Sequence, residues 1–436
     1  MNEQEQAIVP FSVEQLISSV ASKLEQRPKL AHMFGNCIRN TLTTTLRPQQ
    51  DGTVFVITGD IPAMWLRDSA AQVRPYLLLA NEDEGLGDLV SGVVKRQIRY
   101  ILQDPYANAF NESADGSGHQ DDRTEMTPWI WERKYEIDSL CYPLQLAYLL
   151  WQKTGRTDHF DDEFRQACLT ILDVWRTEQN HDVHSAYRFE RFDCPASDTL
   201  PHEGKGNPVA VTGMTWSGFR PSDDACEYGY LVPANMFAVV VLGYMQQIAT
   251  DVYSDHELTQ SAAALQAEIR EGIEQYGIVT HPEFGPMYAY ETDGHGNYNL
   301  MDDANVPSLL SLPYLGYCKP DDERYLNTRR FILSQHNPYY YSGSAAKGIG
   351  SPHTPPQYIW HISLAMQALT SLHTEEQEQL LTLLENTDAD TGFLHEGFHA
   401  DNPAQYTREW FSWANSLFSE LILTHCGYDV PSSKLK

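Results

Sequence analysis

The sequence predicts an all-α protein, an (α/α)6 barrel of six helical hairpins with minor β-hairpins or strands in the loops. Three observations lead to this fold class. Apolar residues recur with helical spacing along most of the chain, convincing strand patterns are few, and six loops of unusual composition return at intervals. No Ser- and Gly-rich linker divides the chain, so we expect residues 1–436 to form a single domain. An irregular all-α enzyme and a pair of helical domains are the alternatives.

The amphipathic helices are predicted from apolar residues at intervals of three and four. Capping-box spacing at Ser12 and Gln15, and again at Thr374 and Gln377, precedes the first and the last of these runs. The sequence MFAVVVLGYM at 236–245 is too short to cross a membrane and is typical of a helix buried on all sides. In chain order the amphipathic runs cover 12–24, 30–42, 86–102, 160–175, 258–273 and 380–384.

Six loops rich in Gly, Pro, Trp, Asp and His alternate with these helices. The best strand pattern, TVFVIT at 53–58, runs into the first loop. Each loop leads into a more apolar helix, and a plainer amphipathic helix then leads to the next loop. If the apolar helices form an inner ring, all six loops lie at one end of the barrel and surround one large pocket. The loops cover 59–68, 121–138, 212–230, 285–303, 342–358 and 395–410.

Composition and charge exclude several functional classes. The formal charge of −29 would repel a phosphate backbone, so no nucleic-acid partner is expected. No run reaches the roughly 18 apolar residues of a membrane helix, and the first residues lack the pattern of a signal peptide. We therefore expect a cytoplasmic protein that binds no membrane. The seven cysteines include no C-x-x-C pair, which argues against a disulfide framework and a cysteine zinc site.

Aromatic residues in polar loops are typical of a sugar-binding surface, because sugar rings have apolar faces and polar edges. The first loop contains GDIPAMWLRDS. Trp65 can supply a stacking face, while Arg67 donates to and Asp68 accepts from the vicinal hydroxyls of a terminal sugar. The structural alternative is that Asp68 caps a helix and Arg67 forms a salt bridge.

The third loop, with the sequence RPSDDACEY, places Arg220 close to the adjacent carboxylates Asp223 and Asp224. Proximity of like charges and partial desolvation by Trp216 and Phe219 favour the protonated form of one carboxyl group. Such a group is a general acid at neutral pH. A polar helix start is the alternative, and the spacing alone leaves open which of the two aspartates is the acid.

The pentapeptide HEGFH at 395–399 matches the H-E-x-x-H pattern of zinc proteases, in which both histidines lie on one face of a helix. Gly397 lies inside the pattern and costs about 1 kcal/mol relative to Ala in a helix. Gly392 before it and D-N-P at 401–403 after it leave room for barely two turns. The segment is therefore predicted to be a loop.

In such a loop Glu396 is the candidate general base that activates water, with His395 and His399 as its hydrogen-bonding neighbours. The metal alternative would need a third ligand, for which Glu420 is a candidate. The other loops add Glu136, Asp138, His353 and Arg408, and further polar candidates are Asp302, Asp303 and Glu409.

At these residues the chain resembles glycoside hydrolase family 125, over about residues 12 to 425. The resemblance implies an (α/α)6 barrel and a metal-independent, exo-acting α-1,6-mannosidase that inverts the anomeric configuration, with no cofactor. The segments that carry it are GDIPAMWLRDSAAQVRPY, KYEIDSLCYP, GMTWSGFRPSDDACEY, SLLSLPYLGY, GIGSPHTPPQYIWHISLAMQALTS and FLHEGFHADNPAQYTREWFSWANSLFSEL.

The resemblance also implies roles for individual residues. Asp223 corresponds to the general acid and Glu396 to the general base, while Arg67 and Asp68 hold the terminal mannose. An inverting glycosidase needs its two carboxyl groups about 6.5–9.5 Å apart, on opposite sides of the scissile bond. The expected partner is a mannose-containing oligosaccharide, such as an N-glycan fragment. The full set of predicted substrate contacts is Trp65, Arg67, Asp68, Glu136, Asp138, Arg220, Asp224, His353 and Arg408.

Three rival hypotheses come from other classes. A sugar epimerase on the same barrel would use histidine acid–base chemistry, for instance His353 and His395. A non-catalytic glycan-binding protein would bind mannosides without releasing a product. A metalloprotease would hold zinc at HEGFH. The sequence does not indicate an oligomeric state.

Overall fold

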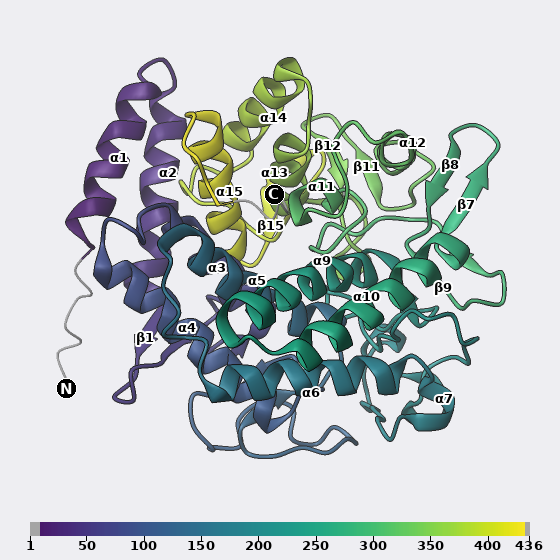
Figure 1. The fold of residues 1–436 in the computed structure, drawn as a ribbon. Helices are drawn as coiled ribbons and strands as arrows, with labels where there is room; N and C mark the ends of the chain where they lie inside the picture. Colours follow the sequence, from purple (N-terminus) through teal and green to yellow (C-terminus); the bar gives the residue numbers. More distant parts are fainter. Residues whose placement is uncertain (1–8, 432–436) are drawn as a thin grey trace.

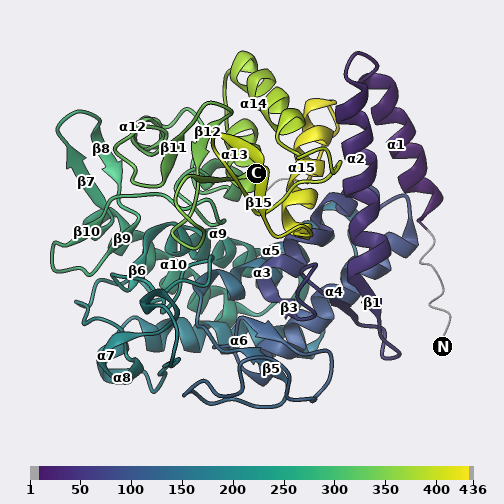
Figure 2. The same ribbon diagram turned by 180° about the vertical axis from the view of Figure 1, so that it is seen from behind.

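The computed structural model describes residues 9–431, and within them the helices form an inner and an outer set. Inner helices pack side by side, with α3 on α5, α5 on α9, α9 on α11, α13 on α15, and α15 back on α3. The last helix also lies beside the second, so the end of the chain meets its start (Figures 1 and 2). The inner helices are α3 (Leu66–Val73), α5 (Ile137–Thr154), α9 (Val232–Ile248), α11 (Leu312–Leu315), α13 (His361–Leu369) and α15 (Ser412–His425).

The outer helices are amphipathic, and the predicted fold class is confirmed. In α10 the buried positions Leu258, Ala262, Leu265, Ile269 and Ile273 follow each other at intervals of three and four, as the sequence predicts. The other face is in solvent. The outer helices are α1 (Phe11–Lys23), α2 (Pro28–Asn40), α4 (Glu84–Gln103), α6 (Asp162–Glu178), α10 (His256–Tyr276), α12 (Glu323–Ile332) and α14 (Thr374–Asn386).

The helix starts differ from the prediction. Neither predicted capping box forms, because α1 begins after Pro10 and α14 after His373, without a side-chain cap. Four outer helices instead begin with an aspartate whose carboxylate accepts the backbone N–H three residues later, which satisfies one of the free donors of the first turn. The capping residues are Asp83, Asp161, Asp255 and Asp322.

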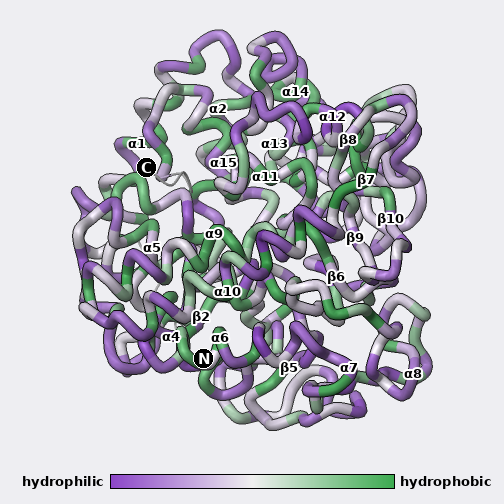
Figure 3. Tube along the Cα trace, turned by 45° about the vertical axis from the view of Figure 1, so that its right-hand side comes forward, coloured by the Kyte–Doolittle hydropathy of each residue, from purple (hydrophilic) through white to green (hydrophobic). Residues whose placement is uncertain are grey.

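Helix α9 is the most apolar inner helix and lies in the core. With the π-helical turn Ala249–Tyr253 it is long and apolar enough to cross a membrane, but 83% of its apolar window is buried inside the protein. It packs between α5 and α10, and the tube along it is largely hydrophobic in Figure 3. The burial is what a central helix of the barrel requires.

The fifth hairpin is less regular than the sequence rhythm predicts. Its inner helix α11 has a single turn, and the buried segment before it is irregular. Pro307 lies in this segment and Pro313 lies in the first turn of α11, and both disfavour a continuous helix. The buried carboxylate of Asp302 accepts the backbone N–H groups of Leu309 and Leu310 at 2.8 and 3.0 Å, in place of helical partners.

Short antiparallel strands fill the loops, as predicted, and bring the loops together at the N-terminal ends of the inner helices. Strands β3, β6 and β13 lead directly into α3, α9 and α13, and a bridge between Gly59 and Phe411 joins the first loop to the last. The strands are β1 (Leu46–Pro48), β2 (Val54–Val56), β3 (Met64–Trp65), β4 (Ala109–Phe110), β5 (Ile130–Glu132), β6 (Tyr230–Leu231), β7 (Ile278–His281), β8 (Gly285–Tyr288), β9 (Glu291–Thr292), β10 (Tyr298–Asn299), β11 (Tyr340–Ser342), β12 (Lys347–Ile349), β13 (Tyr358–Trp360), β14 (Gly397–His399) and β15 (Asn402–Thr407).

Candidate active site

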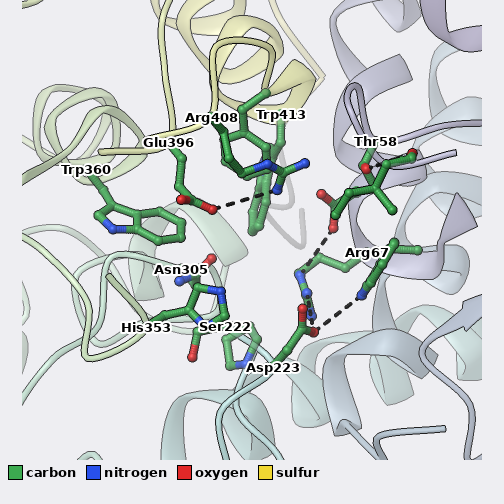
Figure 4. A pocket seen from close by; sticks show the side chains of 15 residues that line it. Thr58, Arg67, Ser222, Asp223, Asn305, His353, Trp360, Glu396, Arg408 and Trp413 are labelled. Carbon is green, nitrogen blue, oxygen red and sulfur yellow. Dashed lines mark hydrogen bonds and ion pairs between the residues drawn. The ribbon is translucent and has the colours of Figure 1, made fainter. Parts of the chain in front are cut away.

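The loops at this end of the barrel surround one pocket that is open to solvent (Figure 4). Its walls come from loops that are more than 300 residues apart in the sequence. Four of the lining side chains are large aromatic groups, which offer apolar faces to a sugar ring. The lining residues are Thr58, Ile61, Trp65, Arg67, Asp68, Pro221, Ser222, Asp223, Asn305, His353, Trp360, Glu396, Arg408, Phe411 and Trp413.

Arg67 lies in the first turn of α3, directly after β3, and its buried guanidinium organises one wall. Nη1 donates to Glu136 Oε2 at 2.7 Å and to Asp138 Oδ2 at 3.1 Å, and Nη2 donates to Asp223 Oδ1 at 3.4 Å. Glu136 and Asp138 come from the start of α5 and lie behind Arg67, outside the pocket lining. These contacts fix the guanidinium at the pocket wall.

Asp68 lines the pocket next to Arg67, with its Oδ2 3.5 Å from Arg67 Nε. Burial raises the pKa of the Asp68 carboxyl to about 6, although the charge of Arg67 acts in the opposite direction. The group therefore changes charge in the mildly acidic range. Asp68 is not an N-cap, because α3 begins at Leu66.

Asp223 reaches the pocket from the third loop in a left-handed backbone conformation, with φ of 68°. Its Oδ1 accepts hydrogen bonds from Trp65 Nε1 at 3.3 Å and Asn108 Nδ2 at 3.2 Å, and Lys134 Nζ donates to its main-chain oxygen at 2.7 Å. Burial disfavours the charged form of Asp223, but the charges of Arg67 and Lys134 outweigh burial and hold the pKa of this carboxyl below its usual range.

Asp224, the neighbour of Asp223, points to a different partner. Its Oδ1 lies 3.2 Å from His353 Nδ1, and its other carboxylate oxygen is buried. Burial disfavours the imidazolium of His353, but the hydrogen bond and charge of Asp224 raise the pKa of His353 to about 9. His353 therefore presents a positive charge to the pocket at neutral pH.

Glu396 lies on another wall of the pocket, across from Asp223 (Figure 4). It directly precedes β14, the middle strand of the sheet β13–β14–β15, and its side chain is 8% exposed. Arg408 Nη1 lies 3.7 Å from Glu396 Oε1, and the same guanidinium is bound by Asp60. The two candidate catalytic carboxyl groups thus face one cavity from different loops.

The histidines of HEGFH do not contact Glu396, contrary to the prediction. His395 is fully buried and is not among the residues that line the pocket. Its Nδ1 lies 3.3 Å from the carbonyl of Arg408 and its ring stacks on Tyr406. His399 accepts the backbone N–H of Asp401 instead.

The metal interpretation of HEGFH is wrong. The pattern is not on a helix, and Glu420, its candidate third ligand, lies 3.3 Å from Arg74 Nε in a separate ion pair. Within residues 9–431 no three His, Cys, Asp or Glu side chains are grouped so that they could hold a metal ion.

Seven of the eleven predicted site residues therefore line one pocket: Trp65, Arg67, Asp68, Asp223, His353, Glu396 and Arg408. The other four lie behind it. Glu136 and Asp138 bind Arg67, and Asp224 binds His353. Arg220 donates to Glu291 Oε1 at 2.6 Å, so it ties its loop to β9 and does not line the pocket.

Several lining residues were missed by the sequence analysis. Trp360, Phe411 and Trp413 lie in segments with recognised motifs, QYIWH and TREWFSWAN, and a search for aromatic residues next to the candidate carboxylates would have found them. Asn305 carries no such signal. It enters the wall because Asp303 binds its backbone N–H and side-chain amide.

Comparison with known proteins points to one family. The family described as metal-independent α-mannosidase (GH125) matches residues 27–423. A solved structure of a metal-independent α-mannosidase from Streptococcus pneumoniae, in a non-productive complex with α-1,6-mannobiose, is 50% identical. It covers 96% of this chain and 99% of its own, with a TM-score of 0.94.

More distant matches agree with this result. The meiotically up-regulated gene 157 protein of Schizosaccharomyces pombe is 42% identical over 435 residues, which cover 94% of this chain and 85% of that protein. A glucoamylase from Saccharomycopsis fibuligera has a TM-score of 0.57 over 99% of both chains at 12% identity, which shows a shared fold alone.

Proposed function

The chain belongs to the metal-independent α-mannosidases of family GH125, and we propose that it removes terminal mannose from the non-reducing end of α-1,6-linked mannosides with inversion. Membership of this family makes the chain a glycoside hydrolase, so the epimerase and binding-protein hypotheses are wrong. The α-1,6 preference rests on the S. pneumoniae structure, which contains α-1,6-mannobiose. N-glycan fragments as the natural substrate and a cytoplasmic location stay predictions.

The observation that supports inversion best is the position of Asp223 and Glu396 on different walls of one pocket (Figure 4). In an inverting glycosidase one carboxyl group protonates the leaving oxygen while the other activates water on the opposite face of the sugar. Asp223 suits the acid because Trp65 and Asn108 fix its carboxyl group at the wall. Glu396 suits the base because its carboxylate faces the cavity, and its contact with Arg408 Nη1, at 3.7 Å, is longer than the hydrogen bonds of Asp223.

The other lining groups support binding of a single terminal sugar. Arg67, His353 and Arg408 can donate to hydroxyl groups, and Asp68 can accept from them. Trp65, Trp360, Phe411 and Trp413 supply apolar faces for the sugar ring. Carboxylates around the anomeric carbon would stabilise the positive charge that develops in the transition state.

Proton NMR of the chain acting on α-1,6-linked mannobiose in excess EDTA tests the proposal. We expect β-mannose as the first product, before mutarotation, and equal rates with and without EDTA. Release of α-mannose first would refute inversion and the assigned roles of Asp223 and Glu396. Hydrolysis of α-1,2- or α-1,3-linked mannobiose at a higher rate would refute the α-1,6 preference.

Exo action has its own test. Reduced mannotriose with two α-1,6 bonds should release mannose and reduced mannobiose first. Early release of unreduced mannobiose would mean that the pocket accepts internal bonds.

A further inference from the structure

Four carboxyl groups share the guanidinium of Arg67. Glu136, Asp138 and Asp223 accept from it at 2.7, 3.1 and 3.4 Å, and Asp68 lies 3.5 Å from its Nε. The side chains of Glu136 and Asp138 are fully buried and that of Arg67 is 3% exposed. Ionisation of all four carboxyl groups would place four negative charges around one guanidinium, and only Asp223, whose side chain is 24% exposed, has substantial contact with solvent.

The other cations around the pocket compensate this charge only in part. Each has a carboxylate partner of its own in the described part of the chain: Lys134 with Asp198 at 2.7 Å, His353 with Asp224 at 3.2 Å, and Arg408 with Asp60. Because isolated buried charges are strongly disfavoured, at least one carboxyl group of the cluster holds a proton.

Glu136 and Asp138 are the two buried candidates for holding that proton. Glu136 Oε2 accepts from Arg67 and from the hydroxyl of Ser139, whereas Glu136 Oε1 and Asp138 Oδ1 are each buried without a hydrogen-bond partner among the described residues. A proton on Oε1 would satisfy this oxygen, since a carboxylic acid donates one hydrogen bond. Burial raises the pKa of Glu136 well above its usual range despite Arg67, and the charge of Asp223 acts in the same direction as burial. Glu136 and Asp223 bind neighbouring nitrogens of one guanidinium, Nη1 and Nη2 of Arg67.

We propose that Glu136 holds the proton that Asp223 delivers to the glycosidic oxygen. This inference rests on the proposed function of the same site. As the bond from the anomeric carbon to the leaving oxygen breaks, its electron pair stays on that oxygen. The proton passes from Glu136 to the ionised Asp223 and from Asp223 to that oxygen, which leaves Glu136 ionised. Water attacks the anomeric carbon and gives its proton to Glu396. Afterwards Glu396 loses a proton to solvent and Glu136 takes one up.

The surroundings of Glu136 support this role. Arg67 faces it from α3, Asp138 from α5 and Asp223 from the third loop, and the thiol of Cys226 is close enough to feel its charge. Arg67 favours the ionised form of Glu136, whereas Asp138, Asp223 and burial favour the protonated form. Asp223, the partner nearest the pocket, is in turn kept ionised by Arg67 and Lys134. The two carboxyl groups are thus arranged as a proton donor, Glu136, and an ionised proton acceptor, Asp223.

Glu136→Gln tests the proposal, because the amide has the same shape and hydrogen-bonds to Arg67 but cannot release a proton. Hydrolysis of α-1,6-mannobiose at neutral pH should fall by about 10²-fold or more, the usual contribution of a general acid. Hydrolysis of 2,4-dinitrophenyl α-mannoside should fall much less, because its leaving group needs no protonation. The alkaline limb of the pH profile for mannobiose should move to lower pH. Equal losses on both substrates with an unmoved pH profile would overturn the proposal.

Asp138→Asn is the matched control. Asp138 is equally buried and binds the same nitrogen of Arg67, so its loss changes the charge of the cluster but keeps the pair of Glu136 and Asp223. It should preserve the wild-type ratio of activities on the two substrates. If Asp138→Asn changes that ratio as much as Glu136→Gln does, the net charge of the cluster controls the protonation of Asp223. A proton held by Glu136 would then not be the source of the acid.

Circular dichroism establishes whether each variant folds. If Glu136→Gln does not fold, Glu136→Asp withdraws the carboxyl group from Asp223 and should still reduce mannobiose hydrolysis more than aryl mannoside hydrolysis. Equal reductions would overturn the proposal. If the wild-type chain itself fails to cleave mannobiose, the proposed function fails. If it cleaves mannobiose and the variants show no selective loss, only the role of Glu136 fails.

Discussion

Replacement of Glu396 by Gln should abolish turnover and leave the fold intact. The nearest cation to the Glu396 carboxylate is Arg408 at 3.7 Å, a distance too long for a strong hydrogen bond. Arg408 keeps its shorter contacts to Asp60 when Glu396 is neutral, with Nε 3.0 Å from Asp60 Oδ1. The variant therefore leaves no buried charge unpaired, and we expect little change in the free energy of unfolding.

The expected loss of activity follows from the loss of the general base. Such a group contributes about 10²- to 10⁴-fold, or about 3–5 kcal/mol of transition-state stabilisation. The assay is release of mannose from α-1,6-mannobiose at saturating substrate, together with calorimetric binding of mannobiose. We expect kcat to fall by this factor while the Kd for mannobiose changes only a few-fold, because the carboxylate acts on water rather than on the bound sugar.

Glu409→Gln is the control, since Glu409 is exposed and lies in the same segment as Arg408. It should retain wild-type kcat. A Glu396→Gln variant with substantial hydrolysis would refute the assignment of the base. A variant with normal kcat and weakened binding would make Glu396 a substrate-binding group.

Three further predictions concern the charged groups. Asp223→Asn should reduce mannobiose hydrolysis by about 10²-fold or more but keep activity on 2,4-dinitrophenyl α-mannoside. Asp224→Asn should reduce mannobiose hydrolysis less. The reverse order of these losses would make Asp224 the acid. The pKa of His353 is raised to about 9, so its pair with Asp224 stabilises the fold fully below pH about 6.5 and is lost as pH rises through 9. The Tm of the wild type should decline over this interval more than that of Asp224→Asn, and parallel curves would contradict the pairing. Arg67→Met should lower the free energy of unfolding in urea by about 3–5 kcal/mol, because it leaves buried carboxyl groups without a cation. A loss below about 1 kcal/mol would mean that the buried carboxyl groups do not depend on Arg67 for stability.

Periodicity in the sequence was sufficient to predict most of the fold, for a physical reason. Outer helices such as α10 must bury one stripe, and inner helices such as α9 must bury every side, so each leaves its own pattern of apolar residues. The fifth inner helix could not be predicted in this way. Its apolar composition is that of an inner helix, but two prolines and the hydrogen bonds to Asp302 replace helical structure.

The site was predictable as a set of loops and less predictable in its contacts. Charged residues next to Trp, Gly and Pro in the six unusual loops stand out in the sequence, so Arg67, Asp223 and Glu396 were found. The direction of a side chain depends on local backbone, which the motif does not reveal. His395 precedes Glu396 directly, but its ring contacts the carbonyl of Arg408 and Tyr406 and does not line the pocket. Arg220 lies near the acid in the sequence, but its partner Glu291 comes from another loop.

The Arg67 cluster explains why the chemistry of this pocket depends on the closed ring of helices. Asp68 follows Arg67 on α3, Glu136 and Asp138 begin α5, and Asp223 belongs to the loop before α9. Three successive hairpins thus contribute charges to one guanidinium. Since α3 packs on α5 and α5 on α9, small movements between the hairpins would alter the charge around Asp223. A variant that loosens the packing of α5 on α9 should therefore change the pH profile of mannobiose hydrolysis as well as the Tm, without any change in the residues that line the pocket.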